Sequence, residues 1–196
     1  DAVTKRGGAH TRAMAKAGQA AEAGRVVTFG MAPTRPEAGY GYIEKGAPLP
    51  GVDGVFAIKS FREKPAQTVA EEFLKDGNYF WNSGMFVFRA DVLLDEMRRY
   101  APQVVESVTA AFEKRKTDLD FIRLDKAAFA QAPDISIDYA IAEKTQVSAV
   151  IPADLGWSDV GSWDALWDIS PKTADGNVLL GDVLTEDAHG CYIRSE

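Results

Sequence analysis

The sequence predicts an α/β domain with a largely parallel or mixed sheet. Along its 196 residues, short apolar runs typical of buried strands alternate with longer segments whose apolar residues recur at helical spacing. From residue 176 onward the pattern changes, because short apolar pairs are separated by Gly, Asp and Asn without a helical period. This change indicates a small all-β addition, such as a first coil of a β-helix. We therefore expect one domain over residues 1–170, and a linker with the first part of a second domain over residues 171–196.

Strands are expected where apolar and β-branched residues run together beside glycine or proline. The candidate strands cover residues 26–29, 42–44, 54–62, 85–88 and 147–151. Most of these runs are too short for a helix and are bounded by turn residues, as buried strands usually are.

Helices are expected between these strands, and several carry recognisable end signals. An Ala-rich segment at residues 10–23 precedes Gly24, a typical C′ residue. Thr68 and Glu71 have the spacing of a capping box, which predicts a helix that starts there and stops at Gly77. Further helices are predicted from Asp91 to about residue 99, from Pro102 onward, and over residues 137–144 with Ser136 as the cap.

Composition argues against several classes of protein. The chain has 22 basic and 29 acidic residues, a net charge of −7, whereas a nucleic-acid-binding surface needs clustered Lys and Arg. No run approaches about 20 consecutive apolar residues, which argues against a membrane partner. The single Cys191 permits no internal disulfide, so we expect a cytoplasmic protein. His10 and His189 are far apart in sequence, which argues against a histidine-based metal site or triad.

Four segments beside predicted strand ends are candidates for binding or catalysis, because open α/β sheets bind ligands at such ends. The Gly-Tyr-Gly segment at residues 39–41 either lets the backbone approach a ligand closely or is a plain turn. Glu63 and Lys64 either grip hydroxyls and a phosphate, respectively, or form an exposed charged strand end. Neighbours in a strand point to opposite faces, so both side chains enter one pocket only at a bend, which Pro65 could supply.

The other two candidate segments are rich in aromatic residues. Near Trp81, a ring can pack on the carbon face of a sugar while the Asn82 amide serves its hydroxyls; core packing would use the aromatics without needing Asn82. Asp159 lies between tryptophans in an expected tight turn and could hold Mg²⁺, which takes one or two protein carboxylates plus water and phosphate oxygens. The same carboxylate could instead form an Asx turn leading into a helix capped by Ser162.

In their order and spacing, six segments resemble the bacterial mannose-1-phosphate guanylyltransferases, including the bifunctional kind fused to mannose-6-phosphate isomerase. These segments are VTFGMAPT at 27–34, EAGYGYI at 37–43, FREKP at 61–65, YFWNSGMF at 79–86, SIDYA at 136–140 and GWSDVGSW at 156–163. The resemblance extends over nearly the whole chain.

The resemblance implies a Rossmann-like, GT-A-like nucleotidyltransferase fold with a mixed sheet, followed by a left-handed β-helix. It implies that GTP and mannose 1-phosphate react to give GDP-mannose and pyrophosphate, with Mg²⁺ as the cofactor. The sugar-phosphate oxygen attacks the α-phosphorus in line, so the protein supplies positioning and electrostatics rather than a nucleophile. By motif, the roles fall on six residues: Tyr40, Gly41, Glu63 and Asn82 at the sugar, Lys64 at a phosphate and Asp159 at the metal, with Lys64 and Asp159 as the catalytic pair.

Two departures from the family pattern lead us to expect only part of an enzyme. The chain has no segment like the family's Gly-rich loop, which carries Arg and Lys and cradles the GTP phosphates. Asp1 stands where the family has its first metal-binding Asp, but Ala2 occupies the position of the following His. We therefore expect the sugar-phosphate half of the fold, inactive alone, whose strand at residues 26–29 would lack neighbours and expose a sheet edge.

Two other functions stay open at this point. One is a thymidylyl- or uridylyltransferase of the same fold, because the segment that reads the base is absent from the chain. The other is a non-catalytic regulatory protein that binds a sugar phosphate. In any of these cases we expect a homo-oligomer to form through the β-helix region.

Overall fold

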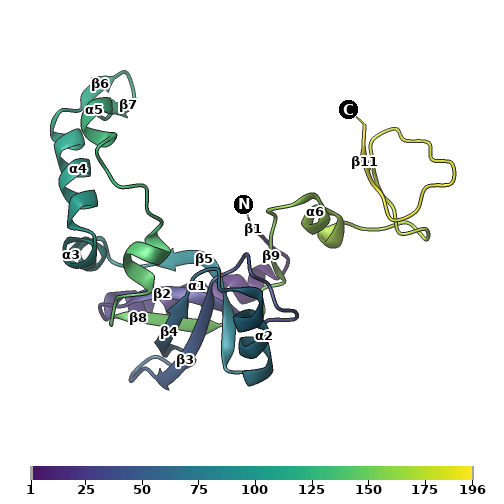
Figure 1. Ribbon diagram of the computed structural model, residues 1–196, viewed down its shortest axis with the longest axis horizontal. Helices are drawn as coiled ribbons and strands as arrows, with labels where there is room; N and C mark the ends of the chain where they lie inside the picture. The colour runs from purple at the N-terminus through teal and green to yellow at the C-terminus, as the bar shows by residue number, and fades with distance from the viewer. Residues whose placement is uncertain (1, 196) are drawn as a thin grey trace. The chain divides into compact units, whose positions relative to one another are not determined.

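The structure, a computed structural model, describes residues 2–195 (Figure 1). Asp1, the second metal ligand implied by the resemblance, lies outside the described residues. The chain divides into two compact units, one over residues 8–154 and the other combining the segments 1–7 and 155–196. Because the second unit takes its residues from both ends of the chain, this division does not follow the predicted boundary at residue 170, which stays a prediction.

Five strands of the larger unit form a closed ring in the order β2-β5-β3-β4-β8. The strands are β2 (Val26–Met31), β3 (Tyr42–Pro48), β4 (Phe56–Arg62), β5 (Tyr79–Val87) and β8 (Ser148–Pro152). Since β2 pairs in parallel with β8 and antiparallel with β5, the sheet is mixed, as predicted. All five strands were predicted, but β5 begins at Tyr79 rather than at residue 85, so the Trp-Asn-Ser-Gly segment lies within the strand.

The expectation that the strand at residues 26–29 would expose an edge is wrong. β2 has a neighbour on each side, because Val26 lies opposite Ser148 of β8 and Val27 lies opposite Val87 of β5. The ring closes where β4 meets β8, with Phe56 opposite Val150. A closed ring covers the unpaired strand edges that template association with other chains.

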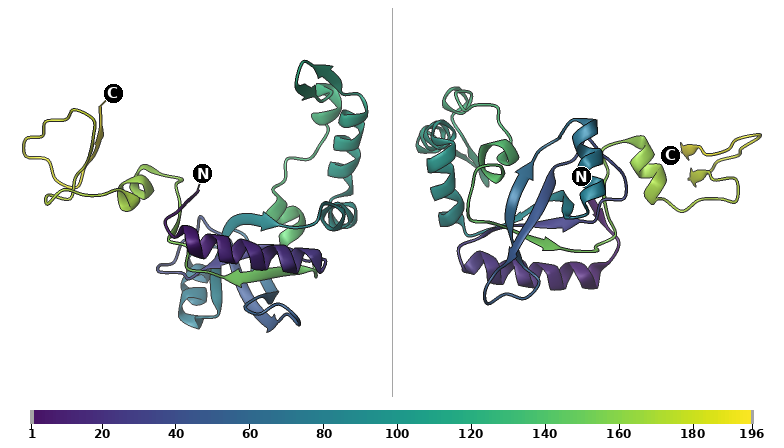
Figure 2. Two further views of the ribbon diagram at one scale, coloured as in Figure 1. Left: turned by 180° about the vertical axis from the view of Figure 1, so that it is seen from behind. Right: turned by 60° about the horizontal axis from the view of Figure 1, so that its bottom comes forward.

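The helix α1 (Gly7–Glu22) lies alongside β8 (Figure 2). It presents small side chains on its buried face. Its buried residues are Ala13, Ala17, Ala20 and Ala21. The predicted helix is present, but it begins three residues before the predicted residue 10 and ends one residue before the predicted residue 23. Small buried side chains allow a helix backbone to approach the surface beneath it closely.

The helix α2 (Gln67–Asp76) ends where the sequence predicts and begins differently. Gly77 follows it with φ 78°, a left-handed conformation that glycine adopts at helix ends without steric cost. The capping box predicted for Thr68 and Glu71 is wrong, because Ala66 is the N-cap and no side chain caps this end. The helix begins one residue before Thr68, which places its side chain inside the first turn.

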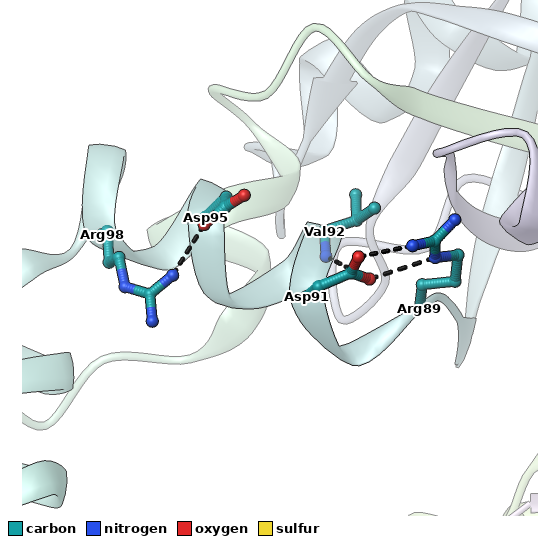
Figure 3. Close-up of polar contacts among 5 residues, drawn as sticks. All are labelled: Arg89, Asp91, Val92, Asp95 and Arg98. Atoms are coloured by element: carbon teal, nitrogen blue, oxygen red, sulfur yellow. Dashed lines mark hydrogen bonds and ion pairs between the residues drawn. The ribbon is translucent and has the colours of Figure 1, made fainter.

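The helix α3 (Ala90–Tyr100) also begins without the predicted cap. Its N-cap is Arg89, and the Asp91 side chain lies in the first turn (Figure 3). The Asp91 carboxylate accepts the Arg89 Nε–H at 3.1 Å and the backbone N–H of Val92 at 3.0 Å. Asp91 therefore places an anion at the positive end of the helix dipole rather than capping the helix from outside.

A group of short elements follows and projects from the ring (Figures 1 and 2). The helix α4 (Pro102–Glu113) starts with proline at its first position, as predicted. It is followed by β6 (Lys116–Asp118), β7 (Phe121–Arg123) and α5 (Lys126–Phe129). None of these three was predicted, because three- and four-residue elements are too short to show a period in the sequence.

A single π-helical turn, η1 (Asp138–Ala142), stands where a longer helix over residues 137–144 was predicted. Ser136 does serve this turn, since its Oγ accepts the N–H of Tyr139 at 3.4 Å. Ile141 is buried and belongs to a cluster against which Met97 of α3 packs. Single π turns inside helical segments are frequent at functional sites.

The second unit has a two-stranded antiparallel sheet of its own. Its strands β1 (Ala2–Thr4) and β9 (Trp157–Asp159) pair antiparallel, so the predicted turn at Asp159 is instead the end of a strand. The helix α6 (Trp163–Ile169) is capped as predicted, because the Ser162 Oγ accepts the N–H of Ala165 at 3.1 Å.

The later part of this unit contains two short parallel strands, β10 (Val178–Leu180) and β11 (Tyr192–Arg194). The buried Asn177 holds the loop between them, donating from Nδ2 to the Ala188 carbonyl at 2.6 Å and accepting the N–H of Cys191 at 2.8 Å. This confirms the all-β character predicted beyond residue 176. No helix among residues 2–195 is both long and apolar enough to cross a membrane.

Candidate functional site

Gly41 lies at the centre of the polar cluster in the larger unit. A Cβ added at this position would lie 2.5 Å from Oε2 of Glu63 and 3.3 Å from Cβ of Asn82. The Gly41 carbonyl accepts the backbone N–H of Asn82 at 2.7 Å. Three residues predicted from separate segments are therefore neighbours, and the missing Cβ leaves room for the Glu63 carboxylate beside the backbone.

The Asn82 side chain is held between two elements. It is 8% exposed and projects from β5. Its Oδ1 accepts the Thr28 hydroxyl of β2 at 2.7 Å, and its Nδ2 donates to Oδ1 of Asp138 in η1 at 3.1 Å. Each contact uses one of two available positions on the amide oxygen or nitrogen, so the amide can still bind a further hydroxyl.

Glu63 and Lys64 follow the end of β4 in a sharp bend. Lys64 has φ 43°, an uncommon conformation for a residue with a side chain, and the bend lets its Nζ lie 3.7 Å from Oε1 of Glu63. The predicted bend is present, and Lys64 adopts it ahead of Pro65. The backbone N–H of Glu63 donates to Oε1 of Glu143 at 2.9 Å, which fixes the start of the bend.

The cluster carries more negative than positive charge. Burial raises the pKa of the Glu63 carboxyl, whose side chain is 10% exposed, and the nearby Asp138 and Glu143 raise it further, while Lys64 opposes them. Burial also raises the pKa of Asp138, with Lys64 and the Asn82 amide opposing and Glu143 adding to the shift. Carboxyls with raised pKa values, gathered beside one ammonium, are typical of sites that bind or convert a ligand.

Tyr40 adjoins this cluster in sequence but packs elsewhere. Its ring meets the Trp81 ring edge-on with centroids 5.2 Å apart, and the Arg35 guanidinium lies 5.7 Å from the centroid of the same indole. Because neighbours in a strand face opposite sides, Trp81 projects from the face of β5 opposite to Asn82. The structure thus groups Gly41, Glu63, Lys64 and Asn82 but directs Tyr40 toward Trp81.

Asp159 belongs to the second unit, at the end of β9, where it is half-buried. Oδ2 of Asp159 lies 3.4 Å from the position that a Cβ at Gly161 would occupy. Across residues 2–195, no three His, Cys, Asp or Glu side chains gather into a metal-binding group. One carboxylate with water and phosphate oxygens is still a donor set that Mg²⁺ accepts, so this residue fits that ion.

Three residues of the cluster were not predicted as site residues: Thr28, Asp138 and Glu143. Thr28 and Asp138 lie in two of the sequence segments that resemble the guanylyltransferases, but no role was assigned to them. Asp138 is separated from its partner Asn82 by 56 positions, and Glu143 from Glu63 by 80. Their proximity to Asn82 and Glu63 depends on contacts between elements that are far apart in sequence, β2, β5 and η1 among them.

The larger unit is an α/β domain with a mixed sheet, and its polar cluster joins residues beside the ends of β3 and β4 to Asn82 within β5. The family profile described as nucleotidyl transferase matches residues 1–176. The chain belongs to the nucleotidyl transferase family.

Within this family, the chain is similar to several named proteins. The chain is 48% identical over 180 residues to a mannose-1-phosphate guanylyltransferase of Salmonella montevideo, covering 90% of this chain and 38% of the relative. It is 45% identical over 186 residues to the alginate biosynthesis protein AlgA of Pseudomonas aeruginosa, covering 95% and 39%. A crystal structure from Thermus thermophilus, described as a mannose-1-phosphate geranyltransferase, aligns with a TM-score of 0.81 at 33% identity, covering 100% of this chain and 55% of that one. The chain thus spans about two fifths of the length of the curated relatives.

Proposed function

We propose that this chain is the sugar-1-phosphate-binding part of a mannose-1-phosphate guanylyltransferase. The reaction joins a phosphate oxygen of mannose 1-phosphate to the α-phosphorus of GTP and breaks the α–β phosphoanhydride bond. GDP-mannose and pyrophosphate are the products. The observation that carries the proposal is the meeting of Gly41, Glu63 and Asn82 in one polar cluster, in a chain 48% identical to an enzyme of that name.

The sugar would bind beside Gly41. The Glu63 carboxylate accepts hydroxyl hydrogens, and the Asn82 amide offers both a donor and an acceptor to a neighbouring hydroxyl. A Cβ on Gly41 would lie 2.5 Å from Oε2 of Glu63, which supports a role for the glycine in leaving room for this carboxylate. Tyr40 would line the edge of the sugar site through its backbone beside Gly41.

Lys64 would bind a phosphate. Its side chain is 60% exposed and its ammonium lies 3.7 Å from the Glu63 carboxylate, so it can turn to an incoming phosphate without leaving the cluster. An ammonium beside the attacking phosphate group orients that group and offsets its charge as the new bond forms. This is the basis for treating Lys64 as catalytic.

Mg²⁺ is the metal proposed for Asp159, with Asp1 as a second ligand by resemblance. When bound, the ion would offset charge on the nucleotide phosphates. The half-buried Asp159 carboxylate supports the assignment, because Mg²⁺ needs few protein ligands when phosphates complete its shell. Asp159 would be the second catalytic residue.

Several finer features belong to the same proposal. The chain is the C-terminal half of a Rossmann-like, GT-A-like fold, and residues 171–196 begin a left-handed β-helix through which copies associate. The parallel pairing of β10 with β11 supports this, since parallel neighbours are what successive β-helix coils form. Placement in the cytoplasm completes the proposal and rests on the single Cys191, which leaves the chain without an internal disulfide.

The proposal is tested by pyrophosphate release with GTP, mannose 1-phosphate and Mg²⁺. We expect turnover from the complete gene product and none from the 196 residues alone. The same assay with dTTP or UTP decides the base, because a preference for either would make the protein a thymidylyl- or uridylyltransferase. Binding of mannose 1-phosphate without turnover by the complete gene product would instead identify a regulatory protein, and clear turnover by the 196 residues would refute the fragment assignment.

A further inference from the structure

The orientation of the Asn82 amide decides what this cluster can offer to a sugar. A hydroxyl that donates its hydrogen to the Glu63 carboxylate can only accept from its other neighbour. The Asn82 amide must therefore direct one N–H of its NH₂ group toward the oxygen of this hydroxyl. A flipped amide would instead place its Oδ1 against the hydroxyl oxygen, and neither atom would have a hydrogen to donate. The residue that selects between the two orientations is thus important for binding.

Thr28 does not make this selection. Its hydroxyl lies 2.7 Å from Oδ1 of Asn82 and can rotate, so it donates to an amide oxygen or accepts from an amide nitrogen equally well. An ionised carboxylate has no such freedom, since it only accepts. Asp138, whose Oδ1 lies 3.1 Å from Nδ2 of Asn82, is the partner that requires the NH₂ group to face it.

We propose that Asp138 is a positioning residue for the sugar: its carboxylate holds the Asn82 amide so that the remaining N–H and lone pair face the ligand beside Gly41. The identity of the ligand in this inference rests on the proposed function. The orientation of the amide does not, because it follows from the contacts of Asn82 with Thr28 and Asp138. Hydrogen bonds to a charged group contribute more than neutral ones, which is enough to keep one orientation dominant.

The surroundings of Asp138 make this control sensitive to pH. It faces Lys64, Glu143 and Glu63 in addition to the Asn82 amide. A protonated Asp138 can donate to the amide oxygen as readily as it accepts from the nitrogen, so protonation removes the preference. Because burial raises the pKa of Asp138, this happens closer to neutral pH than for an exposed Asp.

The test follows the amide itself. The chain contains three asparagines, Asn78, Asn82 and Asn177, so labelling asparagine with ¹⁵N gives three side-chain amide pairs by NMR. We expect the Asn82 pair to shift with a carboxyl titration in the unmodified chain and in Asp134→Asn. Each variant adds a fourth amide pair from its new asparagine. In Asp138→Asn we expect the shift of the Asn82 pair to be lost, while unchanged Asn78 and Asn177 signals report that the variant is folded.

Adding mannose 1-phosphate to the same samples tests the consequence. We expect Asp138→Asn to bind about two- to tenfold more weakly, the range of one hydrogen bond, with no change for the exposed Asp134→Asn. An Asn82 titration that persists in Asp138→Asn, or an unchanged affinity, would overturn the positioning role. If the unmodified chain titrates as expected but binds no sugar phosphate, the proposed ligand is wrong and the control of the amide by Asp138 stands.

Discussion

The space beside Gly41 is bounded by the carboxylate of Glu63, whose Oε2 lies 2.5 Å from the position of a Cβ on residue 41. This is closer than real Cβ contacts, so any side chain at position 41 must displace the carboxylate. Gly41 is not one of the described glycines with a positive φ. A side chain at position 41 is therefore disfavoured by lack of space and not by the backbone conformation.

Gly41→Ala should therefore weaken sugar-phosphate binding while leaving the fold intact. Displacing Glu63 removes a charge-assisted hydrogen bond, which corresponds to a loss of about tenfold or more in affinity. Titration with mannose 1-phosphate measures the affinity, and thermal unfolding checks the fold. Gly18→Ala is the matched control, because its Cβ meets nothing within 4 Å. Equal affinity in the two variants would contradict the role of the Glu63 carboxylate in binding the sugar.

Glu63→Gln should stabilise the chain at neutral pH. The folded-state pKa of Glu63 is raised by burial and by Asp138, so the folded state holds its proton more tightly than the unfolded state. Its contribution to stability is present below the unfolded pKa of about 4.3 and is lost as pH rises through the folded pKa. Unfolding temperatures measured from about pH 4 to pH 8 should fall less steeply in Glu63→Gln. The exposed Glu113→Gln should retain the slope of the unmodified chain.

Lys64→Ala in the complete gene product should raise KM for mannose 1-phosphate by about tenfold, with a smaller change in kcat. The lost contact is to a phosphate present in both the ground state and the transition state, which is why KM carries most of the effect. Lys59→Ala is the control, because this lysine pairs with Glu44 at 2.6 Å on the outside of the sheet. A fall in kcat with an unchanged KM would contradict this expectation, because it would mean that Lys64 contacts the phosphate only in the transition state.

Asp159→Asn in the complete gene product should lower Mg²⁺-dependent turnover by about 100-fold or more. It removes a ligand charge where negative charge develops, and the half-buried strand end tolerates an isosteric amide. Steady-state rates at several Mg²⁺ concentrations measure the effect. Asp164→Asn, in the exposed first turn of α6, keeps normal rates if the metal is assigned correctly. Near-normal activity in Asp159→Asn would mean that the metal binds elsewhere.

The strands of the fold could be predicted from sequence because their cause is local. The runs at residues 26–29 and 147–151 are apolar and β-branched, and both are strands of the closed ring. The closure of that ring could not be predicted, because it depends on Phe56 meeting Val150 across most of the larger unit. The predicted start of α2 at Thr68 was wrong for a different reason: the helix begins one residue earlier, with Ala66 as its N-cap, so the Thr68 side chain is not in a capping position.

The candidate site also contains residues that could be predicted from sequence and one residue, Asp138, that could not. Some members of the site can be recognised one residue at a time from the chemistry of their residue type. These are the glycine Gly41, the carboxylate Glu63, the ammonium Lys64 and the amide Asn82. Asp138 could not be assigned from its own chemistry, because its importance lies in the amide that it orients.

The closed ring has a consequence for the order in which the protein is made. β2 begins at Val26, but its parallel neighbour β8 ends at Pro152. While a ribosome is translating the residues between them, β2 and β4 each lack their neighbour β8. The nascent chain therefore carries unpaired strand edges. The ring therefore closes only after β8 has emerged, and until then its strand edges are open to association with other chains.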